Sequence, residues 1–306
     1  MPGRGQGRGL GYNAQTLTPV LRSVVRRATP ADVRHQWRRL RRGWEKSLAR
    51  WQLARLRGRM FAVPPRTTGE ETLFGYTVRI TDAPNFYIQY KDEFIQRIYH
   101  FESPRPDPLI IDGGSNMGLS ILAFKRAYPR ARIIGFEPDP AILRLLQDNL
   151  RRNELGEGIT LVNAGLGGEA GQMSFVPDGT AGGRIETVGD AKGSFRVRVD
   201  RLSDYLDEPV DFLKLNIEGQ ELPVLQEAAA SGKLGNVRQM VLEYHGFPDA
   251  PQQLGPILDL LDRNGFRYMV HDFDSETNPA TKPPFHLAPQ TTWFCLVYAR
   301  QLEAGA

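Results

Sequence analysis

The sequence predicts an α/β protein built on a seven-stranded, mostly parallel β-sheet with an antiparallel C-terminal hairpin. From residue 109 onward, short apolar segments alternate with segments whose apolar residues recur at steps of three and four. That alternation is the signature of βαβ units, in which helices cover both faces of a parallel sheet. The last two apolar segments, 266–273 and 291–299, are expected to form a hairpin at the sheet edge.

The individual elements follow from the same periodicities. We expect parallel strands at 109–111, 131–137, 159–166, 210–216 and 238–245, and covering helices at 117–128, 140–150, 220–230 and 254–261. Two extra strands, 171–176 and 194–200, are expected in an insertion after the third strand. The glycine-rich residues 177–193 between them indicate a mobile connection, which is either a lid over a ligand or an ordinary surface loop.

Two further segments precede the sheet domain, which we place at 106–300: a basic N-terminal arm, residues 1–60, and a lead-in, residues 61–105. The lead-in is expected to hold a short strand pair and an aromatic-rich helix. The arm carries 14 arginines and Lys46 against Asp32 and Glu45, a net charge of +13, whereas the rest of the chain carries −9. Its first 18 residues are rich in glycine and arginine and indicate a mobile tail.

From about residue 31 the arm shows the spacing of one helix face, with arginines on the other faces. The apolar residues of that face are Val33, Trp37, Leu40, Trp44, Leu48 and Trp51. Three uses stay open: packing on the protein's own core or on a second subunit of a homo-oligomer, docking on a membrane surface through residues 31–60, and contact with nucleic acid.

Composition sets the expected location of the protein. No apolar run reaches the roughly 18 residues that cross a bilayer, which argues against an integral membrane protein. The single cysteine, Cys295, cannot make an internal disulfide or a cysteine-built zinc site. A reducing, cytoplasmic setting is therefore the expectation, with association at a membrane surface through the arm as the alternative.

Polar residues follow five separate strands of the predicted sheet. They are the turn Asp112–Gly118, Glu137, Asn163 with Ala164, Asn216 with Glu218, and Glu243 with His245. In a doubly wound sheet the ligand lies outside the carboxyl ends of the strands, at the point where strand order reverses. The convergence of these residues therefore predicts a ligand site at that edge.

The turn after the first strand indicates a nucleoside that carries no pyrophosphate. A dinucleotide turn reads G-x-G-x-x-G, whereas this one reads D-x-G-x-x-x-G, with Asp112 at the strand end. Glu137, which lies 19 residues after Gly118, is placed to accept hydrogen bonds from a ribose diol. Asp112 would repel a pyrophosphate and favours a ligand with an amino group, to which it is the negative partner directly or through water.

S-adenosylmethionine meets these requirements, with its ribose on Glu137 and its ammonium and carboxylate beside the turn. The residues expected to bind it are Asp112, Gly114, Asn116, Gly118, Glu137, Asn163, Ala164 and Asn216.

Five segments, in this order, resemble the FkbM-type S-adenosylmethionine-dependent methyltransferases. They are IIDGGSNMGLSIL, IIGFEPDP, NL at 149–150, FLKLNIEGQELPVL and VLEYH, within a resemblance that covers roughly residues 85–300. The resemblance implies a class I, Rossmann-like methyltransferase fold. It also implies O-methylation, commonly of a sugar hydroxyl in a glycolipid, polysaccharide or natural product.

Glu218 and His245 are the candidates for the base that removes the proton of an acceptor hydroxyl. Histidine titrates near neutral pH, and Glu218 follows an apolar strand and precedes a glycine, which projects its side chain into the cleft. The structural alternatives are a cap on the following helix for Glu218 and a purely structural strand end for His245. Glu243 is as well suited to orienting Lys214 as to acting itself.

Asn216 is a departure from the family, which usually has aspartate at that position. A divalent metal on Glu218, Glu243 and His245 is conceivable, but the loss of the best hard ligand disfavours it, so we predict S-adenosylmethionine as the cofactor and no metal.

Two other functions stay open at this stage. The basic arm could bring RNA to the site, although base N-methylation typically uses an Asn/Asp-Pro-Pro-aromatic turn where this chain reads LNIEG, so nucleic acid is not the expected acceptor. The other alternative is a non-catalytic scaffold with a vestigial nucleoside site, which Asn216 keeps open.

Overall fold

The computed structural model describes residues 53–177, 183–186, 193–271 and 291–302. The chain divides into two units, Met1–Leu56 and Arg57–Ala306, and the fold below is that of the second unit. The predicted amphipathic helix of the arm, its tail and most of the glycine-rich connection lie outside the described residues. No helix in the described part of the chain is long and apolar enough to cross a membrane.

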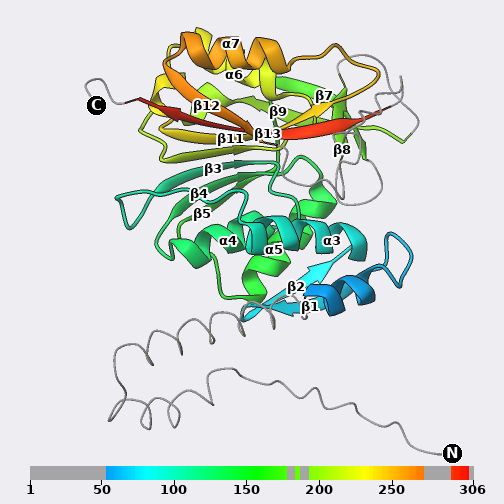
Figure 1. Cartoon of the computed structure of the whole chain (residues 1–306). Coiled ribbons are helices and arrows are strands. Elements are labelled where there is room, and N and C mark those ends of the chain that lie inside the picture. The colour runs from blue at the N-terminus through cyan, green and yellow to red at the C-terminus, as the bar shows by residue number, and fades with distance from the viewer. Residues whose placement is uncertain (1–52, 178–182, 187–192, 272–290, 303–306) are drawn as a thin grey trace, which may run out of the picture. The chain divides into compact units, whose positions relative to one another are not determined.

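A seven-stranded sheet forms the centre of this unit (Figure 1). Its order is β12-β13-β11-β10-β3-β4-β5. The five parallel strands are β3 (Leu109–Gly113), β4 (Arg132–Phe136), β5 (Ile159–Val162), β10 (Phe212–Leu215) and β11 (Gln239–Gly246). β13 (Trp293–Gln301) runs antiparallel between β11 and β12 (Phe266–His271). The predicted mostly parallel sheet with an antiparallel C-terminal hairpin is confirmed.

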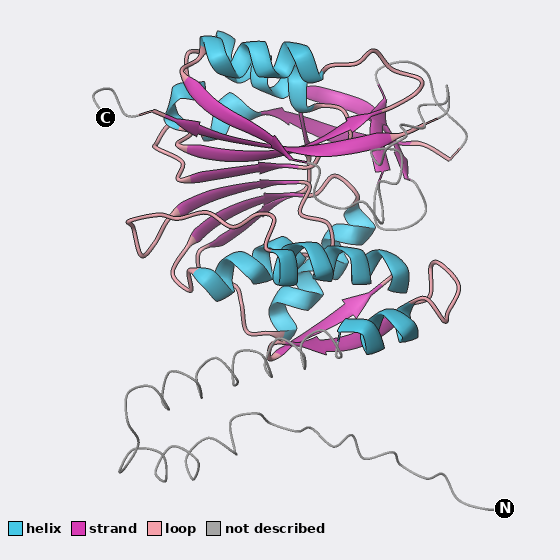
Figure 2. Cartoon of the chain, viewed as in Figure 1, coloured by secondary structure: helices cyan, strands magenta, loops and turns pink. Residues whose placement is uncertain are grey.

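Helices cover both faces of this sheet. α4 (Leu119–Ala127) and α5 (Pro140–Arg152) lie on one face, and α6 (Glu221–Ala230) and α7 (Leu254–Arg263) lie on the other (Figures 1 and 2). The Asp139 side chain caps α5 by accepting from the amides of Ala141 and Ile142, as its position before Pro140 predicts. Strand order reverses between β3 and β10, so the carboxyl ends of these two strands mark the expected ligand edge.

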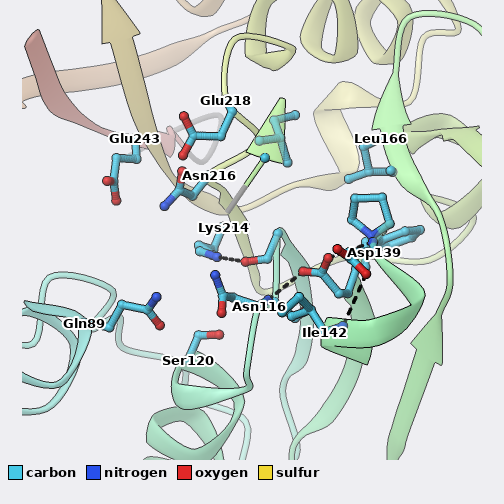
Figure 3. A pocket seen from close by; sticks show the side chains of 18 of the residues that line it. Gln89, Asn116, Ser120, Asp139, Ile142, Leu166, Lys214, Asn216, Glu218 and Glu243 are labelled. Carbon is cyan, nitrogen blue, oxygen red and sulfur yellow. Dashed lines mark hydrogen bonds between the residues drawn. The ribbon is translucent and has the colours of Figure 1, made fainter. Parts of the chain in front are cut away.

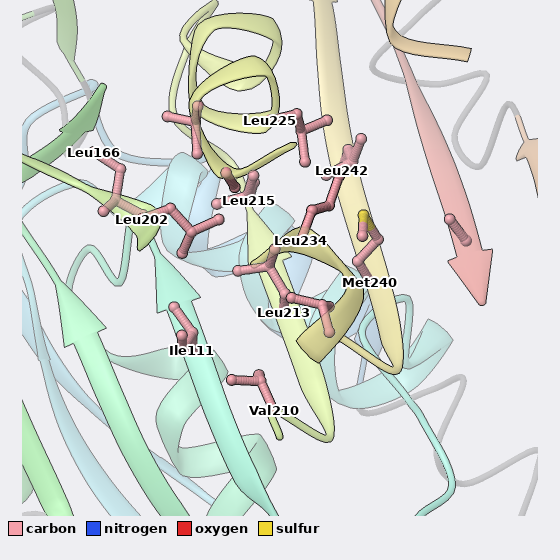
Figure 4. Close-up of a cluster of buried hydrophobic side chains, with 14 of the residues drawn as sticks. Ile111, Leu166, Leu202, Val210, Leu213, Leu215, Leu225, Leu234, Met240 and Leu242 are labelled. Atoms are coloured by element: carbon pink, nitrogen blue, oxygen red, sulfur yellow. The ribbon is translucent and has the colours of Figure 1, made fainter. Parts of the chain in front are cut away.

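The main core lies between the sheet and the helices of the α6 face. Ile111, Leu213, Leu215, Met240 and Leu242, from three adjacent strands, pack against Leu225 and Leu234 (Figure 4). All seven side chains are almost completely buried. Burial of this apolar surface is the main stabilising contribution to the central strands that carry the ligand edge.

The third predicted strand, 159–166, is wrong as a single element. β5 ends at Val162, and β6 (Gly165–Gly167) belongs to a second sheet of order β6-β9-β7-β8, with β7 (Gly171–Pro177), β8 (Gly183–Glu186) and β9 (Phe195–Arg201). The chain leaves the first sheet at Asn163, whose side chain donates to the Glu137 and Pro138 carbonyls instead of continuing the ladder. The two strands expected in the insertion are present as β7 and β9.

The lead-in contains the predicted strand pair, β1 (Gly69–Leu73) and β2 (Tyr76–Ile80), followed by α3 (Ala83–Tyr90). The chain then continues into a π-helical turn, η1 (Lys91–Gln96), which the sequence did not predict. Asn149 of α5 and Asn153, which follows the last residue of α5, hold β2. Asn149 accepts from the Arg79 amide at 2.8 Å and donates to its carbonyl at 3.1 Å, and Asn153 makes the same pair with Thr77 at 2.7 and 2.8 Å. Each side-chain amide thus replaces the peptide of a neighbouring strand.

We expect Asn149→Ala to lower the free energy of unfolding by about 2 to 4 kcal/mol. Asn149 is completely buried, and its loss would leave the Arg79 amide and carbonyl and the Met117 carbonyl without this partner. Urea denaturation measures the change. Asn264→Ala is the matched control, since that side chain donates one local bond to Leu260, and its expected cost is below about 1 kcal/mol. Equal decreases in the free energy of unfolding for the two variants would contradict the role of Asn149 in holding β2.

Candidate active site

A cavity of about 220 Å³ lies at the carboxyl ends of β3, β4, β10 and β11. Five of the ten predicted site residues line it: Gly114, Asn116, Glu137, Asn216 and Glu218. Glu243 also lines it, whereas Asp112, Gly118, Asn163, Ala164 and His245 do not. Figure 3 shows Glu218, Glu243 and Gln89 on one side of the cavity and Asp139, Ile142 and Leu166 on the other.

The turn after β3 is shaped by close contacts of its glycines. Gly114 has φ +80°, and a Cβ there would lie 2.0 Å from the Asn216 carbonyl oxygen, so only glycine lets the two loops touch. Gly118 has φ +94°, and its Cβ would lie 2.3 Å from Leu146 of α5. Gly118 therefore serves the packing of α4 on α5. Between them, Asn116 has φ +50°, and its backbone amide donates to Glu137 Oε2.

Asp112 has a different partner from the one that the sequence indicated. Its side chain is completely buried, its Oδ1 lies 3.0 Å from Lys214 Nζ, and its Oδ2 accepts from Ser120 at 2.6 Å. Lys214 also donates to the Gly114 carbonyl at 2.6 Å. The Asp112 carboxylate is thus paired with a lysine of the neighbouring strand and does not line the cavity. The expected direct contact between Asp112 and the ammonium of a ligand is therefore not supported.

Glu137 follows β4 and forms the wall of the cavity beside Asp139. Its Oε2 accepts from the Asn116 amide at 3.0 Å, and its Oε1 accepts from the Asp139 amide at 2.9 Å. Burial raises the pKa of Glu137 to about 7, against these two amides, which lower it. Each carboxylate oxygen accepts one of these two bonds and retains a lone pair for a further donor.

Asn163 and Ala164 act behind this wall. Asn163 donates to the Glu137 and Pro138 carbonyls at 2.9 and 3.0 Å, which fixes the segment that carries the Glu137 carboxylate. Ala164 is completely buried in the main core. Neither residue lines the cavity, because the chain turns away from the first sheet at this point.

The loop after β10 delivers Asn216 and Glu218 to the cavity. Glu218 has φ +53° and Gly219 has φ +99°, so the loop is held in an uncommon conformation. Glu221 holds it there by accepting from the Ile217 and Gly219 amides at 3.1 and 3.0 Å. Burial raises the pKa of Glu221 to about 7. Glu221 thus supplies the stabilisation at the start of α6 that the alternative interpretation gave to Glu218.

His245 lies between two carboxylates rather than on the cavity wall. Its Nδ1 lies 3.8 Å from Glu218 Oε2, and its Nε2 lies 3.8 Å from Glu243 Oε1. The ring stacks on Phe247 with centroids 5.6 Å apart. Burial lowers the pKa of His245, but the nearby carboxylates of Glu218, Glu243 and Glu221 together raise it by more. The net shift is upward. The neighbouring carboxylates therefore stabilise the protonated form of His245.

Sequence reasoning missed one wall of the cavity, which the lead-in forms. Asn85 and Gln89 of α3, Asp92 and Glu93 of η1, and Tyr99 line it. The Tyr99 hydroxyl donates to Glu243 Oε2 at 2.8 Å and links this wall to β11. The available signal was the charged triplet 91–93 inside an otherwise aromatic segment. Among the residues that the structure covers, no group of three His, Cys, Asp or Glu side chains is arranged to hold a metal ion.

Comparison with known proteins gives the following relatives. The family model described as Methyltransferase FkbM domain matches residues 112–268. The methyltransferase sdnD of Sordaria araneosa is 30% identical over 172 residues, which are 45% of this chain and 66% of the relative. The 31-O-demethyl-FK506 methyltransferase FkbM of Streptomyces tacrolimicus is 27% identical over 229 residues, 63% of this chain and 86% of the relative.

A solved structure of a methyltransferase FkbM from Methylobacillus flagellatus is 19% identical, with 70% of this chain and 52% of that chain covered and a TM-score of 0.42. The chain matches just under two thirds of the length of sdnD. Because the family model spans half of the chain and the sheet has the expected topology, this protein belongs to the FkbM methyltransferase family and has a class I, Rossmann-like fold.

Proposed function

We propose that the protein is an O-methyltransferase that methylates a hydroxyl of a sugar in a glycolipid, polysaccharide or natural product. The observation that supports it most directly is that one cavity contains two chemically different ends (Figure 3). The apolar Ile142 and Leu166 lie at one end with Asp139, whose amide binds Glu137, and Glu218 and Glu243 lie at the other. One end suits a nucleoside, and the other suits an alcohol that must lose a proton.

The residues of the first end fit the cofactor. Glu137 has lone pairs for a ribose diol, and Gly114 lets the backbone approach the ligand. Pro138, Ile142 and Leu166 offer apolar surface for a purine. Asn216 contributes a buried Oδ1 that has no hydrogen-bond partner in the described part of the chain, which suits the cofactor's ammonium.

When bound, S-adenosylmethionine would supply an electrophilic methyl group, whose bond to sulfur breaks as the bond to the acceptor oxygen forms in line with it and S-adenosylhomocysteine leaves. Most of the rate enhancement then comes from holding the acceptor in that geometry. Glu218 accepts the hydroxyl proton as the new bond forms, because a sugar hydroxyl is far too weak an acid to ionise near neutral pH by itself. His245, whose Nδ1 lies 3.8 Å from Glu218 Oε2, orients that carboxylate.

Binding of S-adenosylhomocysteine is expected to strengthen as pH rises from 6 to 8. The pKa of Glu137 is about 7 in the free protein, and only the ionised carboxylate accepts from both hydroxyls of a diol. Below pH 7 the affinity should fall by up to about tenfold per pH unit. Calorimetry measures this, and Glu137→Gln should weaken binding at pH 8 and flatten its pH dependence.

Glu169→Gln is the control for that experiment, since Glu169 is exposed and lies outside the cavity lining. Absence of binding at millimolar S-adenosylhomocysteine, or tighter binding of NAD, would refute the cofactor assignment.

Glu218→Gln should lower methyl transfer by about 10²- to 10⁴-fold with unchanged affinity for S-adenosylhomocysteine, since the amide cannot take a proton. His245→Gln should lower the rate less and shift the acid limb of the pH–rate profile, because it removes the charge beside Glu218. The assay is transfer of labelled methyl groups to extracts of cells that lack the gene, with mass spectrometry for products 14 mass units heavier than the acceptor. Full activity in Glu218→Gln would exclude Glu218 as the base.

A further inference from the structure

The lead-in wall lies at the end of the cavity opposite the nucleoside residues. η1 is a π-helical turn, a conformation that is found frequently at functional sites. The Asp92 carbonyl closes this turn by accepting from the amides of Arg97 and Ile98. Tyr99 then fixes it to β11 through Glu243 at 2.8 Å. Glu93 is therefore held on the cavity wall by its own backbone and by a bond to the sheet.

Negative charge accumulates at this end. Asp92, Glu93, Glu218 and Glu243 line it, and Lys214 is the one lysine or arginine among the described lining residues. Lys214 is already occupied by Asp112 at 3.0 Å and by the Gly114 carbonyl at 2.6 Å. Asp92 has Lys91 Nζ at 3.6 Å, and Glu218 and Glu243 each have a His245 nitrogen at 3.8 Å. Glu93 is the carboxyl group of this set that makes no ion pair with the described residues.

Glu93 carries the clearest sign of an unfilled interaction. Its Oε2 is buried and has no hydrogen-bond partner in the described part of the chain. Burial raises the pKa of Glu93 well above its usual range, Lys214 opposes this, and Asp112, Asp92 and Glu243 add to it. A buried acceptor without a donor is unfavourable, and a donor on a bound molecule would remove that cost.

We propose that Glu93, with Asp92 and Glu243, forms the acceptor subsite, and that this subsite selects an uncharged or cationic sugar and rejects an anionic one, such as a uronate or a sugar phosphate. This inference rests on the proposed function. Hydroxyl and ammonium groups donate to the unpaired oxygen, whereas an anion would add a like charge beside four carboxyl groups in a poorly solvated cavity. Glu93 is then a specificity-determining residue outside the family-model match, 112–268.

The ammonium of the cofactor can also donate to the unpaired Glu93 oxygen. Calorimetry shows whether this oxygen binds the cofactor or the acceptor sugar. Glu93→Gln keeps the shape of the side chain and replaces an ionisable carboxyl group by a neutral amide. We expect its affinity for S-adenosylhomocysteine to stay within about twofold of the wild type, while KM for the acceptor rises about tenfold or more. A loss of S-adenosylhomocysteine affinity that matches the loss in methylation would assign Glu93 to the cofactor and overturn the inference.

The wild-type enzyme tests the charge of the acceptor without any variant. An extract of cells that lack the gene is methylated with labelled S-adenosylmethionine, hydrolysed in mild acid and separated by ion exchange. The labelled sugar should be neutral or retained by the cation exchanger. Label confined to the anion-exchange fraction would overturn the acceptor class.

The same fractions distinguish failure of the proposed function. Absence of label from every fraction, with S-adenosylhomocysteine still bound, would count against sugar O-methylation itself and remove the inference with it. Glu93→Lys should abolish labelling of the original sugar, and the exposed control Glu169→Gln should leave it unchanged. Urea denaturation of Glu93→Lys and Glu169→Gln checks that both proteins fold. Asp92→Asn provides a second variant of the subsite, and we expect it to raise KM for the acceptor as well.

Discussion

The buried ion pair between Asp112 and Lys214 is the interaction on which the rest of the site depends. The two residues face each other in the register of β3 and β10, the strands between which the sheet order reverses. A buried pair is favourable only when further hydrogen bonds satisfy both charges. Ser120 satisfies the carboxylate, and the Gly113 and Gly114 carbonyls satisfy the ammonium. The pair therefore fixes the turn after β3 against the loop after β10.

Both ends of the cavity are built outward from this pair. Toward the nucleoside end, the fixed turn presents the Asn116 amide to Glu137, which Asn163 supports from behind. Toward the acceptor end, Lys214 lies 5.3 Å from the centre of the Tyr99 ring, and Tyr99 continues through Glu243 to His245. One lysine thus connects the sheet, the turn and the lead-in wall.

The sequence predicted what depends on local pattern and missed what depends on pairing between distant segments. Strand and helix periodicity located the sheet, its C-terminal hairpin and the strand ends that carry Glu137, Asn216 and Glu218. It assigned Asp112 to the ligand because the register that brings Lys214 beside it joins residues 102 positions apart. The family resemblance was sufficient for the fold and the family, since the family model confirms the family.

The lead-in wall escaped prediction for the same reason. The lead-in sequence is typical of an aromatic helix. Nothing in its local pattern shows that Asn149 of α5 and Asn153, just after α5, would bind β2. Its charged triplet became informative only once the cavity was known.

The position of this wall along the chain suggests how specificity and chemistry are separated. The residues assigned to the cofactor and the proton transfer lie within the span that the family model matches, whereas Gln89, Asp92 and Glu93 lie before it. Substitutions in that wall leave the Asp112–Lys214 pair, the glycine contacts and Glu137 in place. Acceptor preference can therefore change through the lead-in at little cost to cofactor binding, because binding sites commonly combine variable loops with a rigid scaffold. On this view the sheet edge supplies the methyl transfer, and η1 selects the hydroxyl that receives it.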